Sequence, residues 1–203
     1  MALLSEFIRH DQPLSTGSTA VYPYSVKLER KYKFFSRYGD EVPLCFREGE
    51  KLLHLPRALC PLGEVDNRDE GEDVVFPNAP IPRENQVEVF AETKSFLTKG
   101  LSGIVVAYTG FGKSPLGYYA AHALQKRTLV ITTKDDIYKQ WIKDAPKFLG
   151  IEPHEVGEIR GDKCEVVGTK FCVAMIHSLT KAGKYPDWIT KGFGLVIFDE
   201  IQR

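Results

Sequence analysis

A glycine-rich turn followed by a lysine and a serine is the strongest chemical pattern in the sequence. It reads Ala-Tyr-Thr-Gly-Phe-Gly-Lys-Ser over residues 107–114. Glycines in such a turn let backbone N–H groups point at phosphate oxygens, and a helix N-terminus behind them adds positive potential. Lys113 would reach the β- and γ-phosphates of a nucleotide, and the Ser114 hydroxyl would ligate Mg²⁺. The pattern predicts a phosphate-binding loop, and the alternative is an ordinary glycine turn between a strand and a helix.

Two adjacent carboxylates, Asp199 and Glu200, follow an apolar run near the end of the chain. Asp199 would hold Mg²⁺ through water, and Glu200 would polarise the attacking water. Phosphoryl transfer needs a metal clamp and a positioned nucleophile. The alternative is that the pair merely stabilises the N-terminus of a following helix. Together with the upstream phosphate loop, the pair predicts ATP and Mg²⁺ as cofactors.

Short apolar runs alternate with amphipathic segments through the second part of the chain. Buried strands alternating with helices predict an α/β fold whose parallel sheet is covered on both faces. The expected strands are 103–108, 128–132, 171–176 and 194–198, and the expected helices are 84–99, 114–125 and 135–149.

The N-terminal part has a different texture and predicts a small β-rich accessory domain over residues 1–80. Segments rich in β-forming residues occur at 31–38, 42–47 and 51–57. Residues 31–35 mix lysines with aromatic side chains. This mixture could hold single-stranded nucleic acid by stacking, or the aromatic rings could fill the core of the small domain.

A change of composition marks the end of this domain. Residues 64–73 are strongly acidic and read as a solvated loop, and three prolines fall within 77–82. An acidic loop followed by a proline-rich connector places the domain boundary near residue 80. The second domain is then expected over residues 81–203.

Charge and cysteine content limit the possible partners. Lys+Arg and Asp+Glu each number 27, so a nucleic-acid partner would have to be held by local patches of cations. The four cysteines form no CxxC pair, so we expect no structural metal and a reduced, cytoplasmic setting. No apolar run approaches the ~20 residues of a membrane span, and we expect a soluble, intracellular protein with no membrane contact.

The order and spacing of these motifs resemble superfamily 2 DNA helicases, most closely the UvsW/XPB-like branch with its phage and viral enzymes that remodel branched DNA. Residues 107–114 resemble the first motif of that superfamily, and residues 199–203 resemble its DEAD/DEAH-type box. Arg83 and Gln86 match an Arg-x-x-Gln pattern whose glutamine contacts adenine in that branch. The resemblance implies a RecA-like P-loop domain, incomplete at its C-terminus, that binds ATP through Arg83, Gln86, Thr109, Gly110, Phe111, Gly112, Lys113 and Ser114.

The same resemblance implies contacts to single-stranded or branched DNA. The segment from Leu129 to Trp141 is similar to a motif whose turn lies along the DNA backbone. Thr132, Thr133 and Lys134 occupy that turn, and Ser178 falls where the branch commonly has Gln-Ser-Leu. Gln202 stands where many relatives have a histidine that couples ATP hydrolysis to the nucleic-acid site. Thr133 replaces a usual proline, and Met175 replaces a common DNA-contacting threonine.

The family's motor also uses a second RecA-like domain, which supplies an arginine finger and has no counterpart in the 203 residues. Such fingers contribute on the order of 10³–10⁵ in rate, so we expect weak ATP binding and slow hydrolysis from this chain. The alternatives are a P-loop ATPase acting on protein or RNA, a small-molecule kinase, and a non-catalytic nucleic-acid-binding fragment. The Asp199–Glu200 pair and Gln86 argue against a kinase.

Overall fold

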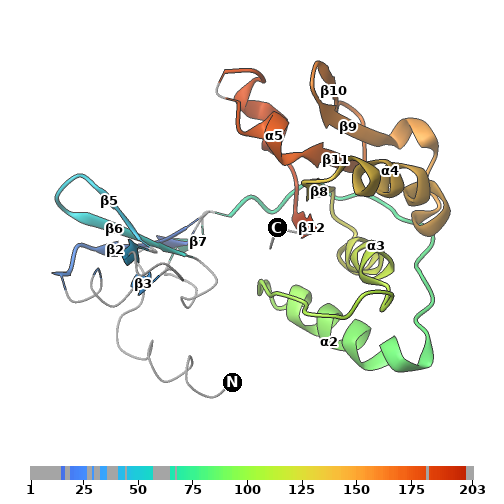
Figure 1. The fold of residues 1–203 in the computed structure, drawn as a ribbon, viewed down its shortest axis with the longest axis horizontal. Coiled ribbons are helices and arrows are strands. Elements are labelled where there is room, and N and C mark those ends of the chain that lie inside the picture. Colours follow the sequence, from blue (N-terminus) through green and yellow to red (C-terminus); the bar gives the residue numbers. More distant parts are fainter. Residues whose placement is uncertain are drawn as a thin grey trace. The chain divides into compact units, whose positions relative to one another are not determined.

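The chain divides into two compact units, Met1–Arg68 and Asp69–Arg203. The computed structural model describes residues 68–181 and 183–199, and before them the stretches 15–16, 19–26, 29, 33–35, 41–43, 45–56 and 65–66. Figure 1 labels strands alone in the first unit and both helices and strands in the second.

The first unit is built from short strands, which confirms its predicted β-rich character. Its described strands are β1 (Ser15–Thr16), β2 (Thr19–Pro23), β3 (Lys33–Phe35), β4 (Glu41–Pro43), β5 (Phe46–Glu48), β6 (Leu52–Pro56) and β7 (Val65–Asp66). One sheet has the order β5-β6-β2-β1-β7, and β3 pairs with β4. A small core holds Ala20, Tyr22, Leu53 and Leu55. The side chains of residues 31–35 lie outside the described part, so their nucleic-acid role stays a prediction.

The second unit contains a sheet with the order β10-β9-β11-β8-β12. Its strands are β8 (Thr128–Thr132), β9 (Val156–Arg160), β10 (Lys163–Glu165), β11 (Phe171–Met175) and β12 (Leu195–Asp199). All neighbours are parallel except the β9–β10 hairpin. This arrangement confirms the predicted α/β fold with a parallel sheet.

Helical segments cover both faces of this sheet. The helices are α2 (Val87–Thr98), α3 (Lys113–Leu124), α4 (Asp135–Leu149) and α5 (Ile176–Leu179). On one face, α3 and α4 pack against Val130 and Val173, and α2 packs against α3. On the other face, Ile189 and Phe193 pack against Leu129. Burial on both sides explains why β8 and β11 read as continuous apolar runs, whereas Val196 and Phe198 of β12 are 44% and 52% exposed.

One stripe of side chains on α4 faces the core. Its members recur every three or four residues and are at most 2% exposed: Tyr138, Trp141, Ala145 and Leu149. Trp141 fits against α3 because residue 117 is glycine. A Cβ atom at Gly117 would lie 2.5 Å from Cη2 of the indole ring. The close approach of α3 and α4 therefore depends on that glycine.

The apolar run 103–108 forms no paired strand in the described structure, so this prediction was wrong. Ile104 and Val106 are 92% and 93% exposed. Among the described strands, β12 pairs only with β8, and a cavity is lined on one side by residues 103–107 and on another by β12. An apolar run indicates a tendency to be buried, but a strand also needs a partner for its backbone hydrogen bonds. The run alone does not encode that partner.

The residues before the proline-rich connector belong to the second unit, because the division falls between Arg68 and Asp69 rather than near residue 80. Phe76 is 1% exposed, and its N–H donates to Oε1 of Gln125 over 2.7 Å. The Asn78 N–H donates to the Leu149 carbonyl over 3.1 Å. These contacts attach the connector to the ends of α3 and α4.

The described part of the acidic run is exposed, as expected, and two of its carboxylates also have partners within the second unit. Asp69 accepts hydrogen bonds from the N–H groups of Gly192 and Gly71 over 2.8 and 2.9 Å, and these bonds lower the pKa of its carboxyl below the ordinary value. Glu72 pairs over 3.1 Å with Arg127, which is 8% exposed. The described acidic side chains of the run, Asp69, Glu70, Glu72 and Asp73, are exposed as the composition predicted, and the fold adds backbone donors and a buried cation that the composition did not predict.

Candidate nucleotide-binding site

The phosphate-loop lysine and the acid at the end of β12 line the same cavity. This cavity has a volume of about 570 Å³ and is lined by α2, residues 103–107, α3, Trp141 and β12. Lys113 and Asp199 both contribute to its lining. The two sequence motifs predicted to meet at one triphosphate therefore converge on one space.

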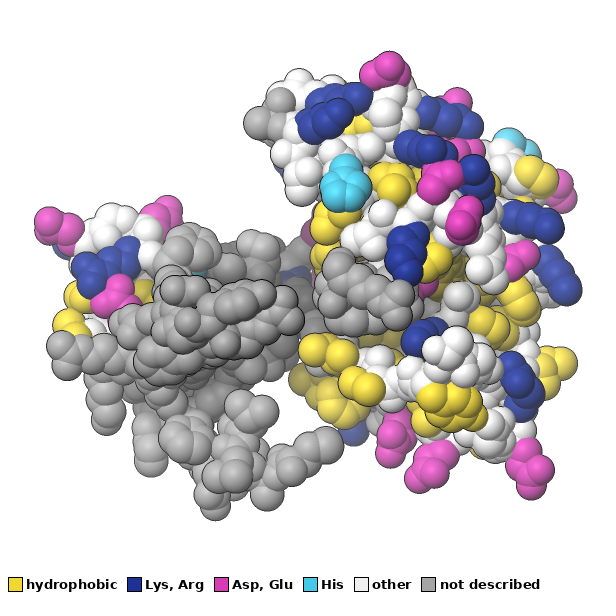
Figure 2. All heavy atoms as spheres, in the orientation of Figure 1, with side chains coloured by type: hydrophobic (Ala, Val, Ile, Leu, Met, Phe, Trp, Pro, Cys, Tyr) yellow, Lys and Arg dark blue, Asp and Glu magenta, His cyan; other side chains and the backbone are white. Residues whose placement is uncertain are grey.

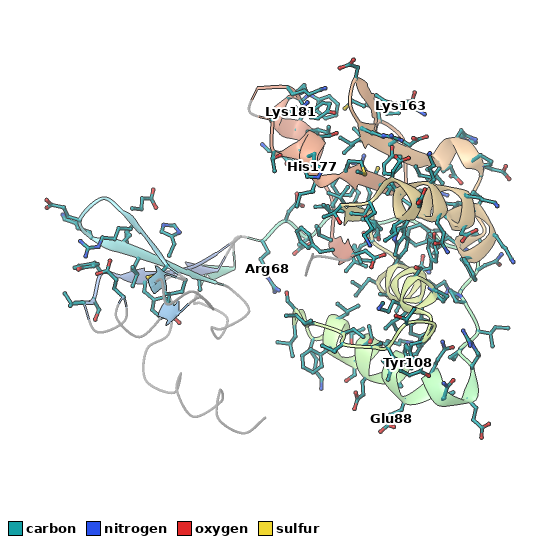
Figure 3. All side chains as sticks on the ribbon, viewed as in Figure 1. Arg68, Glu88, Tyr108, Lys163, His177 and Lys181 are labelled. Atoms are coloured by element: carbon teal, nitrogen blue, oxygen red, sulfur yellow. The ribbon has the colours of Figure 1, made fainter. Side chains whose placement is uncertain are left out.

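Residues 107–112 form a turn that leads directly into α3. Gly110 and Gly112 have φ angles of +86° and +99°, a region that side-chain-bearing residues rarely adopt. The Phe111 N–H donates to the Tyr108 carbonyl over 3.2 Å, and Figure 3 shows Tyr108 near α2. The first-turn N–H groups of a helix lack intrahelical acceptors, so an anion at the start of α3 would find donors there.

Lys113 is held at the turn. It is half-buried, and its ammonium group donates to the Ala107 carbonyl over 3.2 Å. Ser114, the next residue, is also half-buried in the first turn of α3, and Thr109 is exposed. The lysine can therefore exchange a carbonyl acceptor for a phosphate oxygen without leaving the loop.

Gln86 is packed directly against this loop. It is 2% exposed, its Nε2 donates to the Phe111 carbonyl, and its Oε1 accepts from the Arg83 N–H over 2.8 Å. A Cβ atom at Gly112 would lie 2.6 Å from Gln86 Nε2 and 3.6 Å from Arg83 Nη2. Arg83 and Gln86 thus lie beside the phosphate loop, where a nucleotide base could be reached. Their contact with adenine stays a prediction.

Asp199 accepts a hydrogen bond that the sequence did not predict. Trp141 Nε1 donates to its Oδ2 over 2.8 Å, although the two residues are 58 positions apart. The Tyr118 hydroxyl donates to the Trp141 carbonyl over 2.7 Å. Burial raises the pKa of Tyr118 well above its ordinary value, and the negative charges of Asp144 and Asp199 add to this effect. Tyr118 therefore stays a neutral donor beneath the tryptophan.

Two oxygen-bearing side chains, Asp199 in the lining of the cavity and Ser114 next to Lys113 in the first turn of α3, suit magnesium bound together with a nucleotide. The described residues contain no group of three or more His, Cys, Asp or Glu side chains that could hold a metal ion. Mg²⁺ at a nucleotide usually needs only one or two protein oxygens, because phosphates and waters complete its shell. Ser114 and Asp199 would supply those oxygens. Glu200 and Gln202 lie outside the described residues, so their roles stay predictions.

The turn predicted to contact nucleic acid lies at the carboxyl edge of the sheet. Thr132 ends β8, and its strand neighbours there are Asp199 of β12 and Met175 of β11. The Thr132 side chain is 1% exposed, and its Oγ1 accepts from the Lys134 N–H over 3.4 Å. Thr133 is half-buried and Lys134 is exposed. Of these residues, Lys134 is the one whose side chain is best placed to meet a phosphate.

Ser178 has a local partner. It is 6% exposed, and its Oγ accepts from the Gly161 N–H over 3.0 Å. This bond ties α5 to the tip of the β9–β10 hairpin. The predicted nucleic-acid contact of Ser178 remains untested, and its hydroxyl already serves the protein backbone.

Sequence reasoning missed a cluster of cations at the same edge, in which Arg160 pairs with Asp135 over 2.6 Å and Lys163 with Glu158 over 2.7 Å. Figure 2 shows lysine and arginine side chains, with a histidine and interspersed acidic side chains, over the part of the second unit where β10 and α5 lie. Arg160 and Lys163 come from the β9–β10 hairpin, and His177 and Lys181 lie in or just after α5 (Figure 3). Gly161 and Asp162, between two β-forming runs, were the available hairpin signal.

The parallel sheet, the glycine turn at the start of α3 and the acid at the end of β12 define the second unit as a P-loop domain of the RecA-like type. A family model described as "Type III restriction enzyme, res subunit" matches residues 80–203. The chain belongs to this family.

Named relatives agree with this assignment. The chain is 27% identical over 105 residues to "DNA 3'-5' helicase XPB" of Kineococcus radiotolerans, covering 50% of this chain and 19% of that protein. It is 26% identical over 125 residues to "Putative helicase 109L" of Invertebrate iridescent virus 3, covering 58% and 36%. It is 31% identical over 123 residues to "Putative helicase 161L" of Invertebrate iridescent virus 6, covering 59% and 27%.

These matches confirm the superfamily 2 helicase class predicted from the motifs. The chain spans less than two fifths of the length of these three relatives. Among the helices that the structure describes, none has the length and apolar character needed to cross a membrane.

Proposed function

We propose that this chain supplies the ATP-binding lobe of an ATP-dependent DNA helicase or translocase that unwinds or branch-migrates DNA. The observation that carries the proposal is the convergence of Lys113 and Asp199 on one cavity. The exposed Lys134 follows the strand whose last residue, Thr132, lies opposite Asp199. ATP and nucleic acid would therefore be bound at neighbouring positions of one sheet edge.

The residues of the candidate site would each bind a different part of ATP or its magnesium. Lys113 would bind the β- and γ-phosphates together with the N–H groups of the turn, and Gln86 would contact the adenine. Ser114 and Asp199 would hold Mg²⁺, which neutralises phosphate charge when bound. Glu200, the next residue after Asp199, would orient and polarise the attacking water. This division suits phosphoryl transfer, in which positioning and electrostatics supply most of the catalysis.

Nucleic acid would be held through its backbone. Thr133 and Lys134 would contact phosphates from the turn after β8, with Thr132 and Ser178 fixing the neighbouring backbone. Phosphate contacts position a strand without reading its sequence, as a motor that moves along DNA requires. Gln202 would connect the ATP site to this surface, and a second RecA-like domain would close over both sites.

The first test is the variant Lys113→Ala. Removing one charge-assisted contact to phosphate, worth about 1.5–3 kcal/mol, should weaken binding of a fluorescent ATP analogue by about 10- to 100-fold. Lys94→Ala is the matched control, because Lys94 is an exposed lysine on α2 that does not line the cavity. Equal affinity in wild type and Lys113→Ala would refute the ATP-site assignment.

The same proteins test which polymer stimulates ATP hydrolysis. Steady-state ATP hydrolysis by the 203-residue chain should be slow, below the ~1 s⁻¹ that is low for an enzyme, and single-stranded or forked DNA should raise it. Lys113→Ala should abolish the increase, because the phosphates would lack their lysine. Stimulation by RNA or protein in place of DNA would favour the alternative P-loop ATPases.

A further inference from the structure

The hydrogen bond from Trp141 to Asp199 joins two elements that meet at the cavity. Trp141 comes from the middle of α4, and Asp199 is the last residue of β12. The N–H donates to Oδ2 over 2.8 Å, a normal length for a hydrogen bond to an ionised acceptor. Such a charge-assisted bond is about twice as strong as one between neutral groups. The bond therefore constrains the direction of the carboxylate.

The indole that makes this bond is itself firmly held. Trp141 is 2% exposed, and its ring centroid lies 4.6 Å from that of Tyr118 and 6.1 Å from that of Phe171. The Tyr118 hydroxyl donates to the Trp141 carbonyl over 2.7 Å. The absence of a side chain at Gly117 leaves room for the outer edge of the indole. Because the indole is held by these contacts, its N–H can hold Oδ2 of Asp199 in one position.

We propose that Trp141 is a positioning residue that holds Oδ2 of Asp199 and thereby directs Oδ1 toward the magnesium ion that accompanies ATP. The proposal rests on the proposed ATP-dependent function. An indole has one N–H and can serve one carboxylate oxygen, so the second oxygen is left for a cation or its bound water. Both Trp141 and Asp199 line the cavity that contains Lys113.

A packing role alone makes a different prediction from a positioning role. If Trp141 only fills the core, its replacement lowers the affinity of the domain for nucleotide by the same factor with and without Mg²⁺. If Trp141 positions Asp199, its replacement lowers the affinity for Mg²⁺ and leaves nucleotide binding through Lys113 unchanged in the absence of the metal. The two roles are therefore separated by measuring nucleotide binding with and without the metal.

The test uses Trp141→Phe in the 203-residue chain, which keeps an aromatic ring and removes the N–H. Binding of a fluorescent ATP analogue is measured in EDTA and across a Mg²⁺ titration. Loss of such a partner typically costs about 10- to 100-fold in metal affinity, so the half-saturating Mg²⁺ concentration should rise by that factor, while affinity in EDTA stays unchanged. Trp188→Phe is the matched control, because Trp188 is 52% exposed and does not line this cavity.

The outcomes are distinguishable. If wild type binds the analogue, Lys113→Ala does not, and Trp141→Phe shows the wild-type Mg²⁺ dependence, the positioning role is refuted while the proposed function stands. Equal weakening of binding by Trp141→Phe with and without Mg²⁺ also refutes it in favour of packing. If wild type and Lys113→Ala bind equally, the proposed function itself fails.

A second measurement avoids dependence on the folding of Trp141→Phe. The chain has two tryptophans, so Trp188→Phe leaves Trp141 as the only indole. Adding Mg²⁺ to this variant loaded with ATP should change the indole emission, because the charge on its acceptor becomes shared with the metal. Asp199→Asn, made in the same background, should abolish that change. If the indole emission does not change when Mg²⁺ is added, the proposal is refuted.

Discussion

Gln86 and Trp141 each use a buried side-chain N–H to hold a residue of the candidate site. Gln86 donates to the Phe111 carbonyl in the phosphate loop, and Trp141 donates to Asp199. Both donors are only 2% exposed, so neither bond competes with bulk water. The geometry of the candidate site therefore depends on these two contacts as much as on the glycine turn between them in sequence.

At the same scale, Asp69 gives a pH-dependent prediction. Its folded pKa lies below the unfolded value of 3.8 because the N–H groups of Gly192 and Gly71 stabilise the carboxylate. The stability it contributes is present above pH 3.8 and is lost as the pH falls through the lower folded pKa. Asp69→Asn should therefore lower the free energy of unfolding at neutral pH, and the difference from wild type should shrink under acid conditions.

Urea unfolding at several pH values measures this effect. Glu70→Gln serves as the control, since it removes the charge of the adjacent exposed residue without touching the bonds to Gly192 and Gly71. An Asp69→Asn difference that stays constant from neutral to acid pH would show that the carboxylate charge contributes nothing.

Residue types in the site were predictable, but their partners were not. The candidate phosphate loop follows from a local pattern, because the spacing itself encodes the turn, and Gln86 follows from the resemblance to the helicase motifs. The bond from Trp141 to Asp199 spans 58 positions, and the hydroxyls of Thr132 and Ser178 bond to backbone N–H groups. Such contacts arise only when separate elements pack, and no local pattern contains them.

At the scale of elements, the sequence pattern predicted α2, α3, α4, β8, β11 and β12 within three residues of their bounds, and it did not predict the short helix α5. It failed for the run 103–108, which lacks a paired edge in the described structure, and it missed the β9–β10 hairpin. Val156–Arg160 is interrupted by Gly157, where a Cβ atom would lie 2.5 Å from the Glu165 carbonyl oxygen. The glycine that breaks the sequence pattern is the one that allows the hairpin to pack closely.

The contact between α3 and α4 gives a prediction about stability. Gly117→Ala would gain about 1 kcal/mol in helix propensity, but its Cβ would collide with the Trp141 ring. Overpacking typically costs about 1–3 kcal/mol, so we expect a net loss of up to about 2 kcal/mol in the free energy of unfolding, measured by urea denaturation.

A double-mutant cycle identifies the cause. In a Trp141→Phe background the smaller ring leaves room near residue 117, so the cost of Gly117→Ala should fall. Contacting residues show coupling energies of about 0.5–3 kcal/mol. If Gly117→Ala lowers the free energy of unfolding by the same amount in both backgrounds, a collision with the indole ring is not the cause of the loss.

For the whole molecule, the position of the boundary between the units determines which residues the second unit needs in order to fold stably by itself. The family match begins at residue 80, but the second unit begins at Asp69. Phe76 and the segment around it pack onto the ends of α3 and α4. A domain cut at the start of the family match would lose these contacts.

We therefore expect residues 69–203 to form a more stable domain than residues 81–203. Burial of a phenylalanine contributes about 1.5–3 kcal/mol, and the shorter piece should lose at least this amount in urea unfolding. Phe76→Ala within residues 69–203 should reproduce much of the loss, since the side chain is 1% exposed. Equal stability of the two pieces would place the boundary near residue 80 after all.

The attachment of Asp69 to Gly192 has a mechanical consequence. Asp69 is the first residue after the N-terminal unit, and Gly192 lies just before β12, the strand that ends at Asp199. A tension applied to the N-terminal unit would therefore reach the start of the strand whose last residue, Asp199, is the proposed magnesium ligand. In the motor proposed above, a load on the N-terminal unit would act on the segment that leads into the proposed ATP site.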